Sequence, residues 1–322
     1  MKKNSLVTKV LGVALASSLL LAGCGSTSDR TGNTSGSTGD QAPAAEQNTA
    51  QATDTDVTSS ADAGSEEVNP FKTADGKPII VTIGTTSDEN RIWDALNAEL
   101  AARGDDIRVE WINVQQTNQV LADGEVDLNS FQHYAYFEAN TADLGLDLTA
   151  IGETLIVPLN LFSTKHASLD ELPDGAQIAI PEDATNQGRA LHVLEKAGLI
   201  TLADGVGVNG TVSDIAENPK NIRIVEMSGP ELPRTLEDVD AAIINCGYAT
   251  DFGLDPINDP IFKDDIDFSD PAQHPFVNII AARTEDKDNP IYLEVVSAYH
   301  SEGVYNAILE VYHNAAIPAF EY

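Results

Sequence analysis

The chain has very few cysteines and few positive charges. Only Cys24 and Cys246 occur among its 322 residues, and 18 Lys and Arg stand against 51 Asp and Glu, which gives a formal net charge of −33 at pH 7. A surface this acidic repels phosphate backbones and anionic lipid headgroups. The composition therefore excludes nucleic-acid binding and docking on a membrane through a polybasic patch.

Signatures of catalysis and of metal binding are also absent from the sequence. It contains no Gly-x-Ser-x-Gly, no His-Glu-x-x-His, no Gly-x-x-x-x-Gly-Lys and no paired cysteines. The histidines are scattered without the spacing of a zinc site: His133, His166, His192, His274, His300 and His313. We therefore expect a protein that is not an enzyme and that carries no metal and no cofactor.

The first 23 residues have the pattern of an export signal. Lys2 and Lys3 precede an apolar stretch from residue 6 to 21, and Leu21-Ala22-Gly23 stand before Cys24, as in the lipobox of bacterial lipoproteins. The stretch is too short and too polar for a comfortable membrane span, although a plain secretory signal or a short span are the alternatives. We expect lipidation of Cys24, an anchor in the cell membrane and a protein that faces outside the cytoplasm. Only Cys246 then remains, so no intramolecular disulfide can form.

Residues 24–76 are predicted to be the lipidated cysteine and a disordered linker. Between residues 25 and 70 there is no aromatic residue, and Val57 and Val68 are the only larger aliphatic ones. Such a segment cannot bury enough apolar surface to offset the loss of chain entropy. A coil of about 45 residues would reach roughly 35–40 Å, either to let the protein move between solute and transporter or to act as a plain spacer.

From residue 77 onward the pattern alternates between strands and helices. Residues 78–83 form a buried apolar run, Ser87 is expected to cap a helix, and residues 107–111 alternate as a second strand. Similar units recur at residues 177–180, 222–225 and 241–244. This order predicts an α/β fold with mainly parallel sheets, in which ligands bind at the carboxyl ends of the strands.

An aromatic cluster follows the short strand expected at Val126. Phe131, Tyr134, Tyr136 and Phe137 lie within seven residues, together with His133. At the start of a helix, Phe131, His133 and Tyr136 can line one wall of a cleft. The alternative is that the rings belong to the core and that His133 is merely a helix cap.

A second candidate is Arg189, close to the start of a helix that follows residues 177–180. A helix dipole disfavours a cation near its N-terminus by some tenths of a kcal/mol, so this arginine needs an anion. A ligand carboxylate held by the guanidinium and by backbone N–H groups would serve. A salt bridge to Glu182 or Asp183 is the alternative.

Two asparagines adjoin apolar strands. Asn245 ends the run Ala242-Ile243-Ile244, and Asn278 lies between Val277 and Ile279. An asparagine can accept from an ammonium group and donate to a carboxylate. Alternatively, each simply forms a turn at the end of its strand.

In the order and spacing of these residues the chain resembles the methionine-binding lipoproteins of methionine ABC importers, the NlpA/MetQ-like group. The matching residues are Phe131-Gln132-His133 with Tyr136, Asn186 to Arg189, Asn245 and Asn278, within a resemblance that spans about Ile79 to Tyr305. The resemblance implies a two-lobe periplasmic-binding-protein fold of type II, with residues 77–158 and about 265–322 in one lobe and 159–264 in the other. The chain would cross between the lobes near Pro158 and between Asn258 and Asp270.

The resemblance also implies the roles of the site residues and the partners. Arg189 would bind the ligand carboxylate, Asn245 and Asn278 its amino and carboxylate groups, and Phe131, His133 and Tyr136 would enclose its side chain. The partners would be the permease and ATPase of an ABC importer. The chain departs from the family in the loop after the second strand, where Val114 or a glutamine replaces a usual tyrosine. A Met-containing dipeptide or another amino acid therefore stays an alternative ligand, and a surface adhesin or structural lipoprotein without solute is an alternative of another class.

Overall fold

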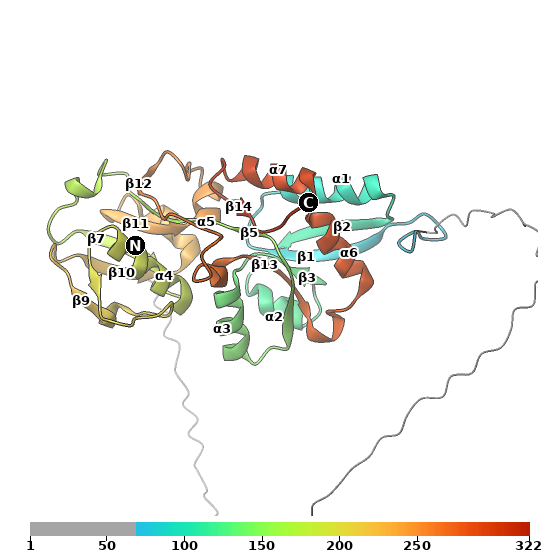
Figure 1. Ribbon diagram of the computed structural model, residues 1–322, viewed down its shortest axis with the longest axis horizontal. Coiled ribbons are helices and arrows are strands. Elements are labelled where there is room, and N and C mark those ends of the chain that lie inside the picture. Colours follow the sequence, from blue (N-terminus) through green and yellow to red (C-terminus); the bar gives the residue numbers. More distant parts are fainter. Residues whose placement is uncertain (1–68) are drawn as a thin grey trace, which may run out of the picture. The chain divides into compact units, whose positions relative to one another are not determined.

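The structure is a computed structural model that describes residues 69–322 (Figure 1). The predicted signal peptide, Cys24 and the predicted linker up to residue 68 lie outside the described residues. Within residues 69–322, no helix combines the length and the apolar character that crossing a bilayer requires.

The first five-stranded sheet has the order β2-β1-β3-β13-β4. Strand β1 runs parallel to both β2 and β3, whereas β13 runs antiparallel to β3 and β4, so β13 alone opposes the other strands. The strands are β1 (Ile79–Thr85), β2 (Ile107–Asn113), β3 (Leu128–Asn129), β4 (Leu148–Glu153) and β13 (Ile279–Arg283). We call this sheet with its helices the first lobe.

The second five-stranded sheet has the order β10-β7-β11-β6-β12 and repeats this plan. Strand β7 pairs in parallel with β10 and β11, and β6 alone runs the opposite way, between β11 and β12. The strands are β6 (Leu159–Phe162), β7 (Gln177–Pro181), β10 (Arg223–Met227), β11 (Ala241–Asn245) and β12 (Pro260–Phe262). We call this sheet with its helices the second lobe. The two sheets confirm the predicted α/β class with mainly parallel sheets.

Helices cover both sheets (Figure 1). In the first lobe they are α1 (Arg91–Arg103), α2 (Thr117–Ala122), α3 (Tyr134–Leu144), α6 (Pro290–Tyr299) and α7 (Glu302–Val311); in the second they are α4 (Ala184–Lys196) and α5 (Cys246–Asp251). Two short ladders complete the described strands: β5 (Leu155–Ile156) with β14 (Ile317–Pro318), and β8 (Thr201–Leu202) with β9 (Ile215–Glu217).

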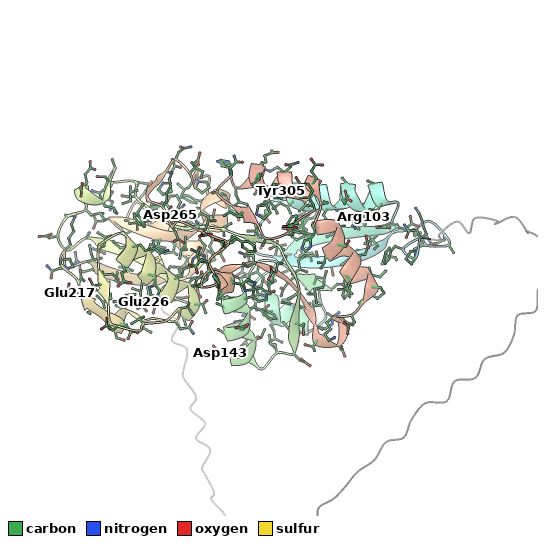
Figure 2. All side chains as sticks on the ribbon, viewed as in Figure 1. Arg103, Asp143, Glu217, Glu226, Asp265 and Tyr305 are labelled. Carbon is green, nitrogen blue, oxygen red and sulfur yellow. The ribbon has the colours of Figure 1, made fainter. Side chains whose placement is uncertain are left out.

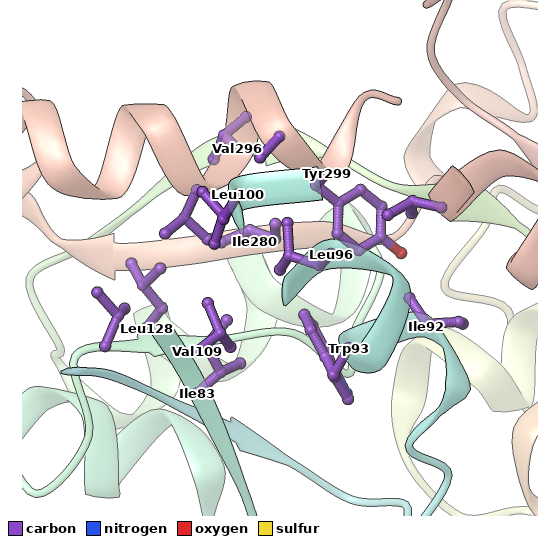
Figure 3. Close-up of a cluster of buried hydrophobic side chains, with 14 of the residues drawn as sticks. Ile83, Ile92, Trp93, Leu96, Leu100, Val109, Leu128, Ile280, Val296 and Tyr299 are labelled. Atoms are coloured by element: carbon purple, nitrogen blue, oxygen red, sulfur yellow. The ribbon is translucent and has the colours of Figure 1, made fainter. Parts of the chain in front are cut away.

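The main core of the first lobe lies between its sheet and helices α1, α6 and α7. Figure 3 shows Leu96 and Leu100 of α1 against Ile83 and Ile280 of the sheet, and each of these side chains is fully buried. Burying a side chain of this size contributes about 1.5–3 kcal/mol. The second lobe has a core of its own around Ile178, Leu191 and other buried residues of β7 and α4. The exposed acidic side chains, such as Asp143 and Glu226, lie on the outside of both lobes (Figure 2).

Two local expectations are corrected. Helix α1 begins at Arg91, after the N-cap residue Asn90, and not next to Ser87; the free N–H of Arg91 donates to the carboxylate of Glu89 at 2.8 Å. The hydroxyl of Ser87 instead accepts the N–H of Glu89 at 3.1 Å. The predicted linker extends to residue 76, but Asn69 donates to Asp105 at 2.8 Å and Phe71 packs against the first core. The chain is therefore held against the first lobe from residue 69 onward.

Candidate ligand-binding site

A cavity of about 340 Å³ lies where the two lobes face each other. Its walls include residues that follow the ends of β1, β7 and β11, which is the edge at which α/β sheets receive ligands. The cavity brings together every site residue that the sequence suggested: Phe131, His133, Tyr136, Arg189, Asn245 and Asn278.

His133 belongs to the cavity and also caps α3. Its Nδ1 accepts the backbone N–H of Tyr136 at 3.1 Å, so the neutral ring carries its proton on Nε2. Nε2 then donates to Oδ1 of Asn186 at 3.2 Å, across the gap between the lobes. Burial, together with the charge of Arg189, lowers the pKa of His133 to about 4. His133 therefore caps α3 and also lines the cavity.

Asn186 is the amide that joins the two walls. Its Oδ1 accepts from Nδ2 of Asn245 at 2.8 Å as well as from His133, and its own Nδ2 lies 3.1 Å from each carboxylate oxygen of Asp183. Asp183 also caps α4 by accepting the N–H of Asn186. Sequence reasoning did not select Asn186 as a site residue, although its place early in a helix after a buried strand was a usable signal.

Arg189 is 7% exposed and lies in the second turn of α4. Its Nη2 donates to the carbonyl of Val157 at 2.7 Å and to Asp264 at 2.9 Å, so the partner is neither Glu182 nor Asp183. The guanidinium also stands 4.8 Å from the centre of the Phe276 ring. Among residues 69–322, Nε and Nη1 have no hydrogen-bond partner, yet neither is sealed from solvent. Burial lowers the pKa of Arg189, and the charge of Asp264 opposes that shift.

Asn245 and Asn278 each present an open carbonyl oxygen. Their Nδ2 groups are used, by Asn186 in one case and by the carbonyl of Leu155 at 3.3 Å in the other. Within the described part of the chain neither Oδ1 has a hydrogen-bond donor, and neither is sealed from solvent. An oxygen in that position can accept from a ligand's ammonium group.

Aromatic rings form another part of the wall. Phe131 and Tyr136 meet edge to face with centroids 6.0 Å apart and an interplanar angle of 78°. Further rings line the cavity from both lobes: Trp93, Tyr248, Tyr299 and Tyr312. Burial raises the pKa of Tyr136 and of Tyr248, so these hydroxyls stay neutral.

Val114 is not among the residues of this wall. Its Cγ2 would lie 3.3 Å from a Cβ placed on Gly84, so it packs against β1. Tyr248, from the segment after β11, supplies a ring that the sequence did not single out.

The thiol in the cavity is uncharged. Cys246 is buried beside Arg189, and desolvation raises its pKa to about 12. Within residues 69–322 no group of three His, Cys, Asp or Glu side chains is arranged to hold a metal ion.

Comparisons with known proteins identify a matching family, a similar sequence and two similar solved structures. Residues 81–320 match the family of the NlpA lipoproteins. The D-methionine-binding lipoprotein MetQ of Escherichia coli is 44% identical over 202 residues, which cover 62% of this chain and 72% of the relative. The crystal structure of the methionine-binding protein MetQ has a TM-score of 0.70 and 38% identity, with 76% of this chain and 99% of that chain covered. A nutrient-binding protein from Burkholderia cenocepacia, solved bound to methionine, has a TM-score of 0.68 and 35% identity, covering 74% and 100%.

Proposed function

The chain belongs to the NlpA lipoprotein family, and on that premise we propose that it is the substrate-binding protein of an ABC importer, with methionine as its ligand. It is not an enzyme. The observation that carries the proposal is the cavity between the lobes, in which a partly free guanidinium and two open amide oxygens face a wall of aromatic rings.

In this proposal each part of an amino acid has a counterpart. The carboxylate binds the free nitrogens of Arg189, a charge-assisted contact that guanidinium geometry suits. The ammonium group donates to Oδ1 of Asn245 and of Asn278. The thioether lies against Phe131 and Tyr136, where contact between sulfur and a ring contributes about 0.3–1.5 kcal/mol.

Ligand binding would also hold the lobes together. The bond from His133 to Asn186 already joins the walls, and Ser87 of the first lobe donates to Asp251 of the second at 2.8 Å. A ligand that contacts both walls stabilises this arrangement over a more open one. The permease of the importer, which works with its ATPase, would then bind the closed surface. A lipid on Cys24 would keep the protein at the outer side of the cell membrane, close to that permease.

Calorimetry of the full chain tests the ligand. We expect L-methionine or D-methionine to bind more tightly than serine, glutamine or aspartate, because a thioether can pack against the rings of Phe131 and Tyr136. Mass spectrometry of gently purified and then denatured protein should release the same amino acid. A protein that is empty, and whose melting temperature no amino acid raises, would instead favour the adhesin or structural lipoprotein.

A Met-containing dipeptide is the second candidate, and one observation favours it. A hollow of about 200 Å³ adjoins the cavity and shares Thr86, Tyr248 and Asp251 with it. Asp251 could accept the ammonium group of an added N-terminal residue. Tighter binding of Gly-Met than of either methionine isomer in the same titrations would select this candidate.

A further inference from the structure

Arg189 is the first member of a chain of three charges that runs from the cavity to the surface. Its Nη2 lies 2.9 Å from Oδ2 of Asp264, and the Nζ of Lys196 lies 3.1 Å from Oδ1 of the same carboxylate. Asp264 is 7% exposed, whereas the side chain of Lys196 is 53% exposed and does not line the cavity. We call these residues the Arg189–Asp264–Lys196 charge triad.

The charge triad also connects the two segments that link the lobes. Arg189 holds the carbonyl of Val157, just before β6, at 2.7 Å. Asp264, just after β12, accepts the N–H of Leu159 at 3.4 Å and donates its own N–H to Asn160 at 2.9 Å. The guanidinium that faces the cavity is therefore fixed by both linking segments at once.

Lys196 determines the net charge of these three residues. Arg189 and Asp264 alone would form a neutral pair. Asp264 would then offset part of the attraction between Arg189 and a ligand carboxylate, although not all of it, because Asp264 does not line the cavity and lies farther from the ligand. Lys196 compensates the second oxygen of Asp264, which leaves the three residues with a net charge of plus one. A partly buried cation whose charge is not cancelled attracts an anion more strongly than a paired one does.

We infer that Lys196 is a positioning residue for the ligand carboxylate: it compensates Asp264, so that Arg189 holds the linking segments and still presents a positive charge to the cavity. This inference rests on the proposed function, because it concerns a ligand that carries a carboxylate. Lys196 acts from the far end of α4, seven residues and about two turns after Arg189.

A simpler role for Lys196 has to be separated from this one. A lysine in the last turn of a helix is favourable to the helix dipole wherever it occurs, and it can hold Asp264 in place without affecting the ligand. These roles differ in what a change of charge does. Loss of a structural salt bridge lowers the free energy of unfolding. Loss of the charge that compensates Asp264 instead weakens the binding of an anionic ligand, and more so the more negative the three residues become.

The experiment titrates the full chain with L-methionine by calorimetry and compares charge variants. Lys196→Met and Lys196→Glu change the net charge of the three residues to zero and to minus one. Lys72 is a matched control, because its Nζ lies 3.1 Å from Asp106 and its side chain is 52% exposed, far from the cavity residues. We expect Lys196→Met to weaken binding about threefold to tenfold, as for a partly screened charge, Lys196→Glu to weaken it further, and the same changes at Lys72 to leave it unaltered.

The double variant Lys196→Met with Asp264→Asn decides between charge and bridge. It restores a net charge of plus one and keeps an oxygen that Arg189 can bond, so its affinity should exceed that of Lys196→Met and return to within about 1.5-fold of the wild type. A double variant that binds as weakly as Lys196→Met, or a Lys196→Met protein that binds like the wild type, overturns the inference. A wild-type chain that binds no L-methionine overturns the proposed function and the inference with it.

Discussion

Two groups of amide side chains in this protein make their hydrogen bonds in different ways. The internal amide network lies inside the first lobe and consists of Asn118, Asn129, Gln132 and Asn140; the first three are at most 3% exposed. The cavity amides are Asn186, Asn245 and Asn278; Gln132 also lines the cavity, but its side-chain amide donates to Asn118 and Asn129 of the internal network. Both groups consist of side-chain amides, and Asn129 and Asn245 each end a buried strand.

The internal network closes on itself. Asn118 donates to Gln132 and to Asn140, each at 2.8 Å, and its Oδ1 accepts from Asn129 at 2.8 Å and from Gln132 at 2.6 Å. The cavity amides share one oxygen, that of Asn186, and leave those of Asn245 and Asn278 without a donor in the described part of the chain. A network in which every amide is paired fixes one arrangement of the core. A network with unpaired oxygens can still accept hydrogen bonds from a ligand.

The largest effect should come from the charged neighbour of the cavity amides. Arg189→Ala removes the only guanidinium among the cavity residues and should cost about 2–5 kcal/mol of binding free energy, because it leaves a buried carboxylate of the ligand unpaired. Calorimetry with L-methionine measures this loss. Arg189→Lys is the control for charge without the planar fork, and it should recover part of the affinity. An unaltered dissociation constant for Arg189→Ala would remove Arg189 from the site.

The closed network should respond in stability instead. Asn118→Leu leaves partner groups of Asn129 and Gln132 buried without hydrogen bonds, which should lower the free energy of unfolding by about 2–4 kcal/mol. Urea unfolding measures it, and the affinity of the protein that stays folded should remain within about twofold of the wild type. Loss of affinity without loss of stability would place Asn118 with the cavity amides and break the comparison.

A lower pH should reduce the stability contributed by the residues around the cavity amides. It should leave the internal amide network unchanged, because that network contains no titratable side chain. The pKa of His133 is lowered from 6.5 to about 4 in the folded protein, since burial and Arg189 disfavour the charged ring while Asp183 and Asn186 oppose this only in part. The folded state thus binds fewer protons than the unfolded one. The stability that neutral His133 contributes is complete above pH 6.5 and is lost as the pH falls towards 4, by roughly 3 kcal/mol in all.

His133→Gln isolates this contribution from that of the many carboxylates. Its amide can still donate to Asn186, but it does not titrate. The difference in unfolding free energy between wild type and variant, measured by urea unfolding at pH 7, 6, 5 and 4, should therefore depend on pH. A constant difference would mean that the pKa of His133 is the same in the folded and the unfolded state.

A smaller effect is expected at Asn245. Asn245→Leu removes one open carbonyl oxygen. It should reduce the binding free energy of L-methionine by about 1–3 kcal/mol, because a donor group of the ligand loses its acceptor. Stability should change by less than about 1 kcal/mol, since Asn186 keeps the hydrogen bond from His133. The pair Asn118→Leu and Asn245→Leu is the direct test of the comparison: the same substitution should act on stability in one place and on binding in the other.

The sequence predicted the fold class and the cavity residues better than their hydrogen bonds. Apolar runs and helix signals are local, so the alternating strands and helices could be read from neighbouring residues. Partners are not local. Asp264 lies 75 positions from Arg189, and the residues near it in sequence, Glu182 and Asp183, were the reasonable but wrong alternatives.

The same limit applies to the amides. Nothing near Asn118 or Asn245 in the sequence shows which of them closes a network, because closure depends on Asn129, Gln132 and Asn186 meeting them in space. The prediction of Ser87 as a cap was wrong for a related reason: the helix begins four residues later, and the N–H of Arg91 donates to Glu89 instead.

The smallest effect is expected at Val114, where the family usually has a tyrosine. The side chain packs against β1 next to Gly84 and does not line the cavity, so Val114→Tyr should alter the affinity for L-methionine and for Gly-Met by less than about twofold. Tyr248→Val is the matched control, because that ring does line the cavity and its removal should weaken both ligands. If Val114→Tyr tightens L-methionine and excludes Gly-Met, the loop after β2 reaches the ligand in the bound state, and the wall of the cavity then includes a segment that this structure places outside it.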